Sequence, residues 1–126
     1  VTLSPIPTFR KWLRSQKQTY NDNEMPANNT KEEVVRQLAG DYLLTAKKEN
    51  GLPQDPVARF HLGNGAQIYD VHANADISNK GLEQSLGAMV NYEYDLNKIE
   101  ENHEQFIQNG SIATSSNLKL DALIKT

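Results

Sequence analysis

Apolar residues recur with two different spacings along this chain of 126 residues. Between residues 31 and 49 they follow a period near 3.6, which is typical of an amphipathic helix. Residues 66–72 and 91–96 instead form short runs typical of strands, and residues 1–3 resemble the end of another strand. Because strands and helices alternate, we predict an α/β (α+β) fold with a small sheet and flanking helices, and not a helical bundle.

Capping signals mark the beginnings of two helices. Thr30 with Glu33 forms a capping box for the helix over 31–49. Asp55 followed by Pro56 is typical of a helix start, because Asp accepts from the first free amides and Pro suits the first helical position. The chain after Pro56 is therefore predicted to form a short helix.

Spacing alone predicts the remaining helices. We expect one helix over 8–18 and another over 78–90, the second with Leu82, Leu86 and Met89 on one face. Two more are expected nearer the end of the chain, a charged helix capped by Asn97 and ending at Asn109-Gly110, and a weak helix in the last sixteen residues.

Charge and composition argue against metal ions, nucleic acids and membranes as partners of this chain. The net charge of −3 offers no broad basic surface for nucleic acid, and the chain contains no cysteine for disulfide, thiolate or metal chemistry. The histidines at 61, 72 and 103 lack metal-ligand spacing. No apolar run approaches the roughly eighteen residues that a membrane helix needs. We therefore predict no metal site and neither a nucleic-acid nor a membrane partner.

The predicted sheet is small for an independent domain. Only three strands are expected, and a sheet of that size usually continues elsewhere. The chain also opens with Val-Thr-Leu-Ser-Pro, as an interior strand would. We expect residues 1–126 to be the C-terminal portion of one domain, with a processed mature N-terminus as the alternative.

Ser4 stands at the predicted end of the first strand. The prolines at 5 and 7 remove ladder donors, so the strand is expected to stop there in a stiff, extended turn. A hydroxyl held in this way can donate and accept hydrogen bonds in a fixed direction. By pattern alone, a serine that caps a turn amide explains the segment equally simply.

His61 lies in the last turn of the predicted helix after Pro56, just before Gly63-Asn64-Gly65. A helix C-terminus favours the protonated imidazole, and glycine allows a close backbone approach. An ordinary, partly buried histidine that caps carbonyl groups is the alternative. Tyr92 and Tyr94, on the strand over 91–96, are expected to face opposite sides, and either is compatible with simple core packing.

Three segments together resemble malonyl-CoA decarboxylases. Residues 4–13 (SPIPTFRKWL) resemble that family's SPIPGFxxWL stretch, and residues 56–66 (PVARFHLGNGA) resemble its PVAxFHLxNGA stretch. Residues 81–94 (GLEQSLGAMVNYEY) resemble the GLxxSxGLMxNYxY stretch that follows. The order of the three motifs is the family's, and the resemblance extends over residues 1–13 and 52–107.

The resemblance implies an N-acetyltransferase-like (GNAT) fold, of which this chain carries the C-terminal part with an incomplete sheet. The family's helical N-terminal domain and its acyl-CoA loop are expected to be absent from residues 1–126. By motif position, the catalytic serine falls on Ser4 and the catalytic histidine on His61, with Tyr94 at the active site. Substrate contacts are predicted within the same motifs, at Pro5, Ile6, Asn64, Gly65 and Asn91.

This sequence departs from the family pattern in places, of which two bear on the local structure. Thr8 stands where glycine is usual, so the turn after Pro7 is expected to differ. Ala73 stands where tryptophan is usual, which changes the local packing.

The implied reaction converts malonyl-CoA to acetyl-CoA and carbon dioxide. The thioester is itself the electron sink, so no metal or organic cofactor is required. Ser4 would orient the departing carboxylate, His61 would stabilise or protonate the enolate, and Tyr94 would be a second donor. A rival mechanism makes Ser4 a nucleophile activated by His61. A relative that only binds acyl-CoA or transfers acyl groups is the alternative function.

The resemblance also implies partners and location. Malonyl-CoA and acetyl-CoA are the expected ligands, and a homo-oligomer is expected because the family forms tetramers. A bacterial cytoplasmic location is preferred, with mitochondria as the alternative.

Overall fold

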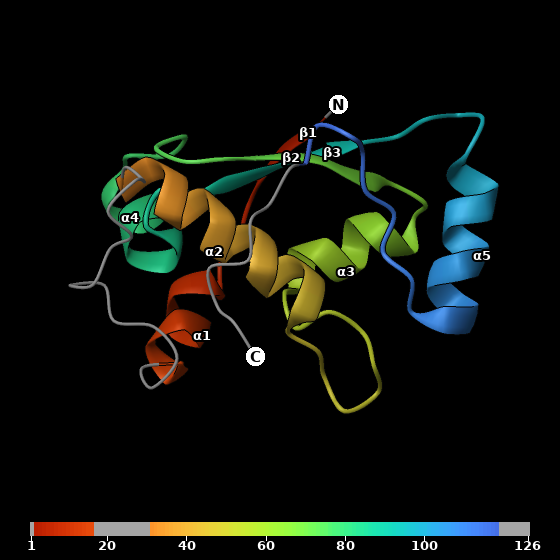
Figure 1. The fold of residues 1–126 in the computed structure, drawn as a ribbon, viewed down its shortest axis with the longest axis horizontal. Coiled ribbons are helices and arrows are strands. Elements are labelled where there is room, and N and C mark those ends of the chain that lie inside the picture. Colours follow the sequence, from red (N-terminus) through yellow and green to blue (C-terminus); the bar gives the residue numbers. More distant parts are fainter. Residues whose placement is uncertain (1, 17–30, 119–126) are drawn as a thin grey trace.

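A computed structural model describes residues 2–16 and 31–118, and its centre is a three-stranded antiparallel sheet (Figure 1). The strands are β1 (Thr2–Pro5), β2 (Gln67–His72) and β3 (Met89–Glu93), arranged in the order β1-β3-β2. The last strand in the chain is thus the central one, and it pairs with both others. The mixed composition of strands and helices that the alternating spacings predicted is confirmed.

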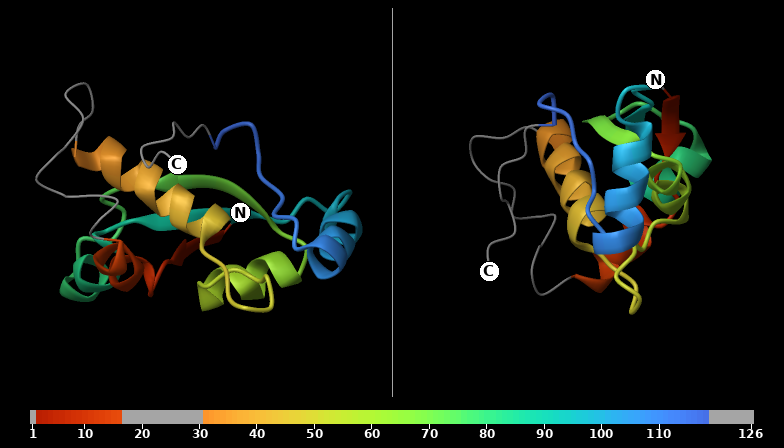
Figure 2. Two further views of the ribbon diagram at one scale, coloured as in Figure 1. Left: turned by 60° about the horizontal axis from the view of Figure 1, so that its bottom comes forward. Right: turned by 90° about the vertical axis from the view of Figure 1, so that its right-hand side faces the viewer.

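Five helices surround the sheet in the described part of the chain: α1 (Phe9–Ser15), α2 (Lys31–Thr45), α3 (Pro56–Gly63), α4 (Asn79–Ser85) and α5 (Ile99–Asn109). Figure 2 shows α2 against one face of the sheet and α3 against the other. α5 packs beside α3, and α1 packs against both α2 and α4. The sheet is therefore buried between helical layers.

Strand register decides which side chains face α3. Ser4 on β1 and Val71 on β2 are both opposite Val90 on β3, while Ile68 is opposite Tyr92. Because cross-strand partners share a face and residues alternate along a strand, these five side chains lie on the same side. All five are buried, so this face forms part of the hydrophobic core around Ser4.

The expected end of β1 before the prolines is wrong. The strand includes Ser4 and continues to Pro5, which is opposite Met89. Within the described sheet, β1 lies at the edge and pairs with β3 alone. An edge strand tolerates proline because the amide that proline lacks would face away from the neighbouring strand.

The predicted helix over 78–90 is shorter in the structure. α4 ends at Ser85, and Leu86 takes a left-handed conformation with φ 55° as the C-cap. Met89 begins β3, so it does not share a helical face with Leu86. Pairing of this segment with two strands buries Val90 completely, and that burial overrides the helical spacing.

The other helical bounds also differ from expectation. α2 ends at Thr45 and not at residue 49, because residues 47 and 53 pair in an isolated bridge that turns the chain. α5 ends at Asn109 as expected, but its N-cap is Lys98 without a side-chain bond, so the predicted cap by Asn97 is wrong. Residues 111–118 contain no helix. Residues 119–126 and Thr30, with its capping box, lie outside the described residues.

The predicted start of α3 is confirmed in detail. Asp55 is the N-cap, its carboxylate accepts from the Ala58 amide at 2.9 Å, and Pro56 is the first helical residue. The same buried carboxylate accepts from the Thr8 hydroxyl at 3.3 Å, and Thr8 also hydrogen-bonds to the Tyr42 hydroxyl. These bonds tie the start of α3 to α1 and α2.

Replacing Gly65 tests the close packing after α3. Gly65 has φ 90°, and a Cβ there would lie 2.4 Å from the Ile99 carbonyl oxygen at the start of α5. Gly51 has φ 83° but open space around it, so it is a matched control. Gly51→Ala should lower the free energy of unfolding by about 1–2 kcal/mol, from backbone strain alone. Gly65→Ala should cost clearly more in urea unfolding, and equal losses would contradict this packing.

A second prediction concerns the pH dependence that Asp55 imposes on stability. Burial raises the pKa of the Asp55 carboxyl above its ordinary 3.8, although its hydrogen bonds with Ala58 and Thr8 oppose the shift. The unfolded chain therefore releases this proton at lower pH than the folded protein does. Asn caps helices about as well as Asp, so Asp55→Asn keeps the cap without the titration.

The free energy of unfolding of the wild type, relative to Asp55→Asn, should fall as the pH rises from about 3.8 through the raised folded-state pKa. Urea unfolding of both proteins between acid and neutral pH measures this difference. A difference that stays constant or rises with pH would show that the carboxyl is not destabilised by burial.

Candidate active site

The Ser4 hydroxyl and the His61 imidazole meet in the core, although 57 residues separate them in sequence. The Ser4 Oγ atom lies 3.1 Å from His61 Nε2, and both residues are buried. Antiparallel pairing of β1 with β3 turns Ser4 toward α3, and His61 occupies the last turn of that helix. The structure thus brings together the serine and histidine that the sequence singled out.

Tyr94 completes a chain of hydrogen bonds through the imidazole. Its hydroxyl lies 2.6 Å from His61 Nδ1, and the residue stands just past the end of β3. Both ring nitrogens are therefore engaged, Nε2 by Ser4 and Nδ1 by Tyr94. β1, α3 and the segment just after β3 each supply one member of this group.

Aromatic rings enclose His61. The Tyr92 ring lies nearly parallel to the imidazole, with centroids 4.4 Å apart and planes 23° apart, and Phe60 meets it edge-on at 5.2 Å. The expectation that Tyr92 and Tyr94 face opposite sides is wrong, because residues two apart on a strand share a face. That spacing was the signal in the sequence for a second tyrosine beside His61.

Burial sets the protonation of this group. Removal from water lowers the pKa of His61, so the imidazole is neutral at pH 7. The position at a helix C-terminus favours the charged form, but desolvation is the larger effect here. Burial also raises the pKa of Tyr94, which keeps the phenol protonated.

A neutral imidazole carries one proton, which allows two arrangements. If Tyr94 donates to Nδ1, the proton of His61 is on Nε2 and is donated to the Ser4 oxygen. The Ser4 hydroxyl proton is then free to bind another acceptor. If Nδ1–H instead donates to Tyr94, Nε2 accepts the proton of Ser4 and the imidazole is placed as a base.

The predicted substrate-contact residues near Ser4 and after His61 have different surroundings. The Pro5 ring is exposed, whereas Ile6 is fully buried in the core. Asn64 is the C-cap of α3, with its side-chain amide donating to the Phe60 carbonyl at 2.8 Å. Gly65 packs against the start of α5. The structure gives Ile6, Asn64 and Gly65 packing roles that hold the end of α3 and the β1 turn.

Asn91 lies on the other face of the sheet. It stands between Val90 and Tyr92 on β3, so alternation turns its side chain away from α3. Its partner in register is Asp70, whose carboxylate accepts from Arg36 of α2 at 2.9 Å. The structure therefore separates Asn91 from the group formed around the imidazole.

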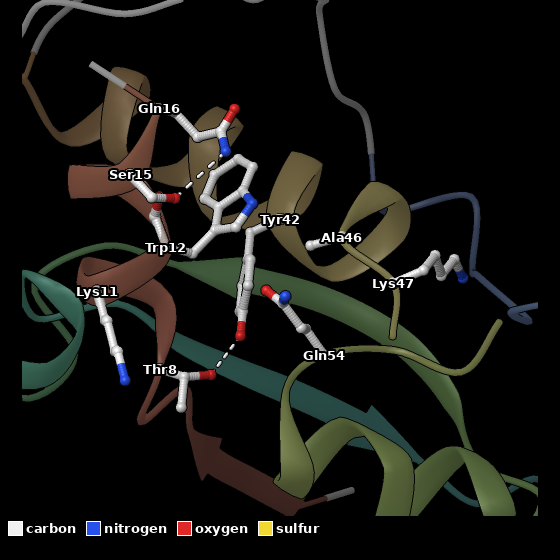
Figure 3. Close-up of a pocket in the computed structure, with 9 residues that line it drawn as sticks. All are labelled: Thr8, Lys11, Trp12, Ser15, Gln16, Tyr42, Ala46, Lys47 and Gln54. Atoms are coloured by element: carbon white, nitrogen blue, oxygen red, sulfur yellow. Dashed lines mark hydrogen bonds between the residues drawn. The ribbon is translucent and has the colours of Figure 1, made fainter. Parts of the chain in front are cut away.

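A cavity of about 430 Å³ lies elsewhere, between α1, the end of α2 and the segment before α3 (Figure 3). Trp12 and Tyr42 form its aromatic wall, and Lys11 and Lys47 also line it. Ser4, His61 and Tyr94 are not among its lining residues. The Thr8 and Tyr42 hydroxyls, whose bond Figure 3 shows, connect its floor with the start of α3.

The described residues contain neither a cluster of potential metal ligands nor a helix that could span a membrane. Across residues 2–16 and 31–118, no three His, Cys, Asp or Glu side chains gather as metal ligands would. Over the same ranges, every helix is too short or too polar to cross a bilayer.

Comparison with known protein families matches all of residues 1–126 to the family described as malonyl-CoA decarboxylase C-terminal domain. Among curated proteins, the chain is 29% identical to mitochondrial malonyl-CoA decarboxylase from Rattus norvegicus, over 93% of this chain and 31% of that protein. The enzyme of the same name from Mus musculus gives 29% identity over 93% and 31%. The chain thus spans about a third of the length of these relatives.

Solved structures agree with this comparison. A malonyl-CoA decarboxylase from Rhodopseudomonas palustris is 41% identical, with a TM-score of 0.80 over 91% of this chain and 31% of that chain. One from Cupriavidus metallidurans is 34% identical, with a TM-score of 0.74 over 91% of this chain and 36% of that chain. The match of the whole sequence and the similarity of the backbone lead to one conclusion: the chain belongs to the malonyl-CoA decarboxylase family, in its C-terminal domain.

Proposed function

We propose that the polypeptide carrying this chain decarboxylates malonyl-CoA to acetyl-CoA and carbon dioxide. The observation that carries the proposal is the hydrogen-bond chain from the buried Ser4 through the buried His61 to the half-buried Tyr94, in a member of this family. In the reaction, the bond between the terminal carboxylate and Cα breaks, and its electron pair moves into the thioester carbonyl. The resulting enolate is then protonated on carbon, which gives the acetyl group.

The protein has three tasks in such a reaction. It must hold the carboxylate out of the carbonyl plane, stabilise the developing oxyanion, and supply a proton. We assign the first to the Ser4 hydroxyl, and the stabilisation or protonation of the enolate to His61. Tyr94 is the second donor, and it acts on the imidazole through Nδ1.

Of the two proton arrangements, the one with Tyr94 as donor is better supported chemically. A phenol is more acidic than a neutral imidazole N–H and so is the stronger donor, and an unprotonated imidazole nitrogen is a good acceptor. The proton of His61 is then on Nε2, next to the Ser4 oxygen. In this state the imidazole cannot remove the Ser4 proton, so Ser4 acts as a hydrogen-bond donor and not as a nucleophile.

The wider setting is also part of the proposal. We place residues 1–126 as the C-terminal portion of a GNAT-like catalytic domain. The match to a C-terminal domain and the coverage of about a third of each relative support the C-terminal placement. The ligands would be malonyl-CoA and acetyl-CoA, in a homo-oligomer. The structural relatives from bacteria support a bacterial cytoplasmic location, and the mitochondrial names of the curated relatives support the alternative.

Removing the serine or the histidine tests the proposed reaction. In the full-length protein, Ser4→Ala and His61→Asn should each lower the rate of carbon dioxide release from malonyl-CoA by about 10²- to 10⁴-fold, since each removes a donor at the reacting group. Ser85→Ala, at another buried serine, and His103→Asn, on α5, are matched controls that should keep the wild-type rate.

Different experimental results would contradict the proposed site, the proposed function and the proposed role of Ser4. Full activity in both Ser4→Ala and His61→Asn would overturn the proposed site. Tight binding of malonyl-CoA by the wild type without release of carbon dioxide would favour the acyl-CoA-binding alternative. A covalent malonyl or acetyl adduct on Ser4, found by mass spectrometry of the rapidly quenched enzyme, would replace the donor role with the nucleophile role.

Tyr94→Phe tests the proton arrangement. The change removes the Nδ1 partner and keeps the ring, so kcat should fall about 10-fold, while the ¹⁵N shifts of His61 should show less of the Nε2–H tautomer. Tyr69→Phe on β2 is a matched control with unchanged kcat. If His61 already carries its proton on Nδ1 in the wild type, the assignment of Tyr94 as donor is wrong.

A further inference from the structure

Tyr92 forms a flat support beneath the catalytic imidazole. The two rings are 4.4 Å apart at their centroids and 23° from parallel. Tyr92 is fully buried at the centre of the sheet, and β1 and β2 flank its strand. One face of the imidazole is therefore covered by the Tyr92 ring, and the strand that carries Tyr92 is held between two neighbouring strands.

Hydrogen bonds alone leave one motion of the imidazole free. Ser4 and Tyr94 engage one ring nitrogen each, so the imidazole can still tilt about the line that joins its two nitrogens. A hydrogen bond to an imidazole nitrogen is best in the plane of the ring, and tilting weakens both bonds together. A flat surface against one face of the ring removes this remaining motion.

The Tyr92 hydroxyl has no part in this contact. It is buried and forms no hydrogen bond with any of the residues that the structure describes. Burial raises the pKa of Tyr92, and the nearby Asp55 carboxylate adds to the shift, so the phenol stays neutral. The ring face of Tyr92, and not its hydroxyl, is what His61 meets.

We propose that Tyr92 is a positioning residue, which holds the plane of His61 so that Nε2 faces Ser4 while Nδ1 faces Tyr94. This role rests on the proposed decarboxylation, in which His61 handles the enolate. Tyr92 does not touch the reacting atoms, and it acts only through the imidazole. It also excludes water from one face of the ring, which keeps the imidazole neutral.

The titration of His61 reports on this contact. The groups that face His61 from packed elements are Ser4 on β1, Tyr92 on β3, and Tyr94 just after β3. Asp55 begins the same helix, and His103 of α5 hydrogen-bonds to the Gly63 carbonyl at its end. The pKa of His61 is lowered by burial, so exposing a ring face should raise it toward its ordinary value.

The test compares Tyr92→Leu, which loses the stacking ring, with Tyr92→Phe, which restores it, in the full-length protein. Phe9→Leu is the matched control for losing an aromatic ring elsewhere in the core. NMR titration of His61 without substrate gives its pKa, and steady-state kinetics with malonyl-CoA give kcat and KM. The wild-type spectrum adds a readout that needs no variant, because a stacked ring shifts the carbon-bound protons of His61 upfield.

Tyr92→Leu should raise the His61 pKa and lower kcat about 10- to 100-fold, with KM within twofold of the wild type. Tyr92→Phe should restore both values, and Phe9→Leu should lower the melting temperature without moving the His61 pKa. Should Tyr92→Leu fail to fold, the unbranched Tyr92→Met replaces it with the same expectation.

An unshifted His61 spectrum in the wild type would overturn the stacking role. So would a Tyr92→Leu protein that matches Phe9→Leu in both stability and His61 pKa. The NMR readouts need no turnover, so they hold even if the protein releases no carbon dioxide. Full activity of His61→Asn would instead overturn the role of His61 in the reaction and leave the stacking contact in place, whereas a wild type that releases no carbon dioxide would overturn the proposed function.

Discussion

The site depends on the two hydrogen bonds that engage both nitrogens of the His61 imidazole. Ser4 arrives on β1, Tyr94 follows β3, and His61 comes from α3, so three separate elements meet at one ring. Such a meeting needs the strand register and the docking of α3 to place the three side chains within about 0.5 Å of the geometry that their hydrogen bonds require. The caps and tight turns around α3 are the means by which the chain meets this requirement.

The start of α3 shows how stability is arranged around the site. Asp55 is a buried carboxylate that caps the helix and also accepts from Thr8, which in turn bonds to Tyr42. Thr8 stands where the family resemblance led us to expect glycine, and its hydroxyl joins three helices. The turn thus differs from the family pattern through an added polar link. This link fixes the beginning of the helix that carries His61 at its end.

Much of the secondary structure could be predicted because it depends on local chemistry. The Asp55-Pro56 start of α3 and the end of α5 at Asn109 are examples, since caps act within one turn. The spacing of Met89 from Leu82 fits a helix, but pairing with two distant strands decides its conformation. For the site, pattern alone left Ser4 and His61 open, and only the joint resemblance singled them out. The position of Asn91 behind the sheet depends on register, which no local signal reports.

The short strand β1, which carries Ser4, affects how easily the serine separates from the rest of the site. β1 has four residues and, in the described sheet, pairs with β3 along one edge. Ser4 stays beside His61 only while this four-residue pairing holds, and a short segment of a fold can open locally without global unfolding. His61, Tyr92 and Tyr94 would then remain together without their serine. The contact between Ser4 and His61 is therefore limited by the local opening of β1, and the free energy of that opening cannot exceed the free energy of global unfolding.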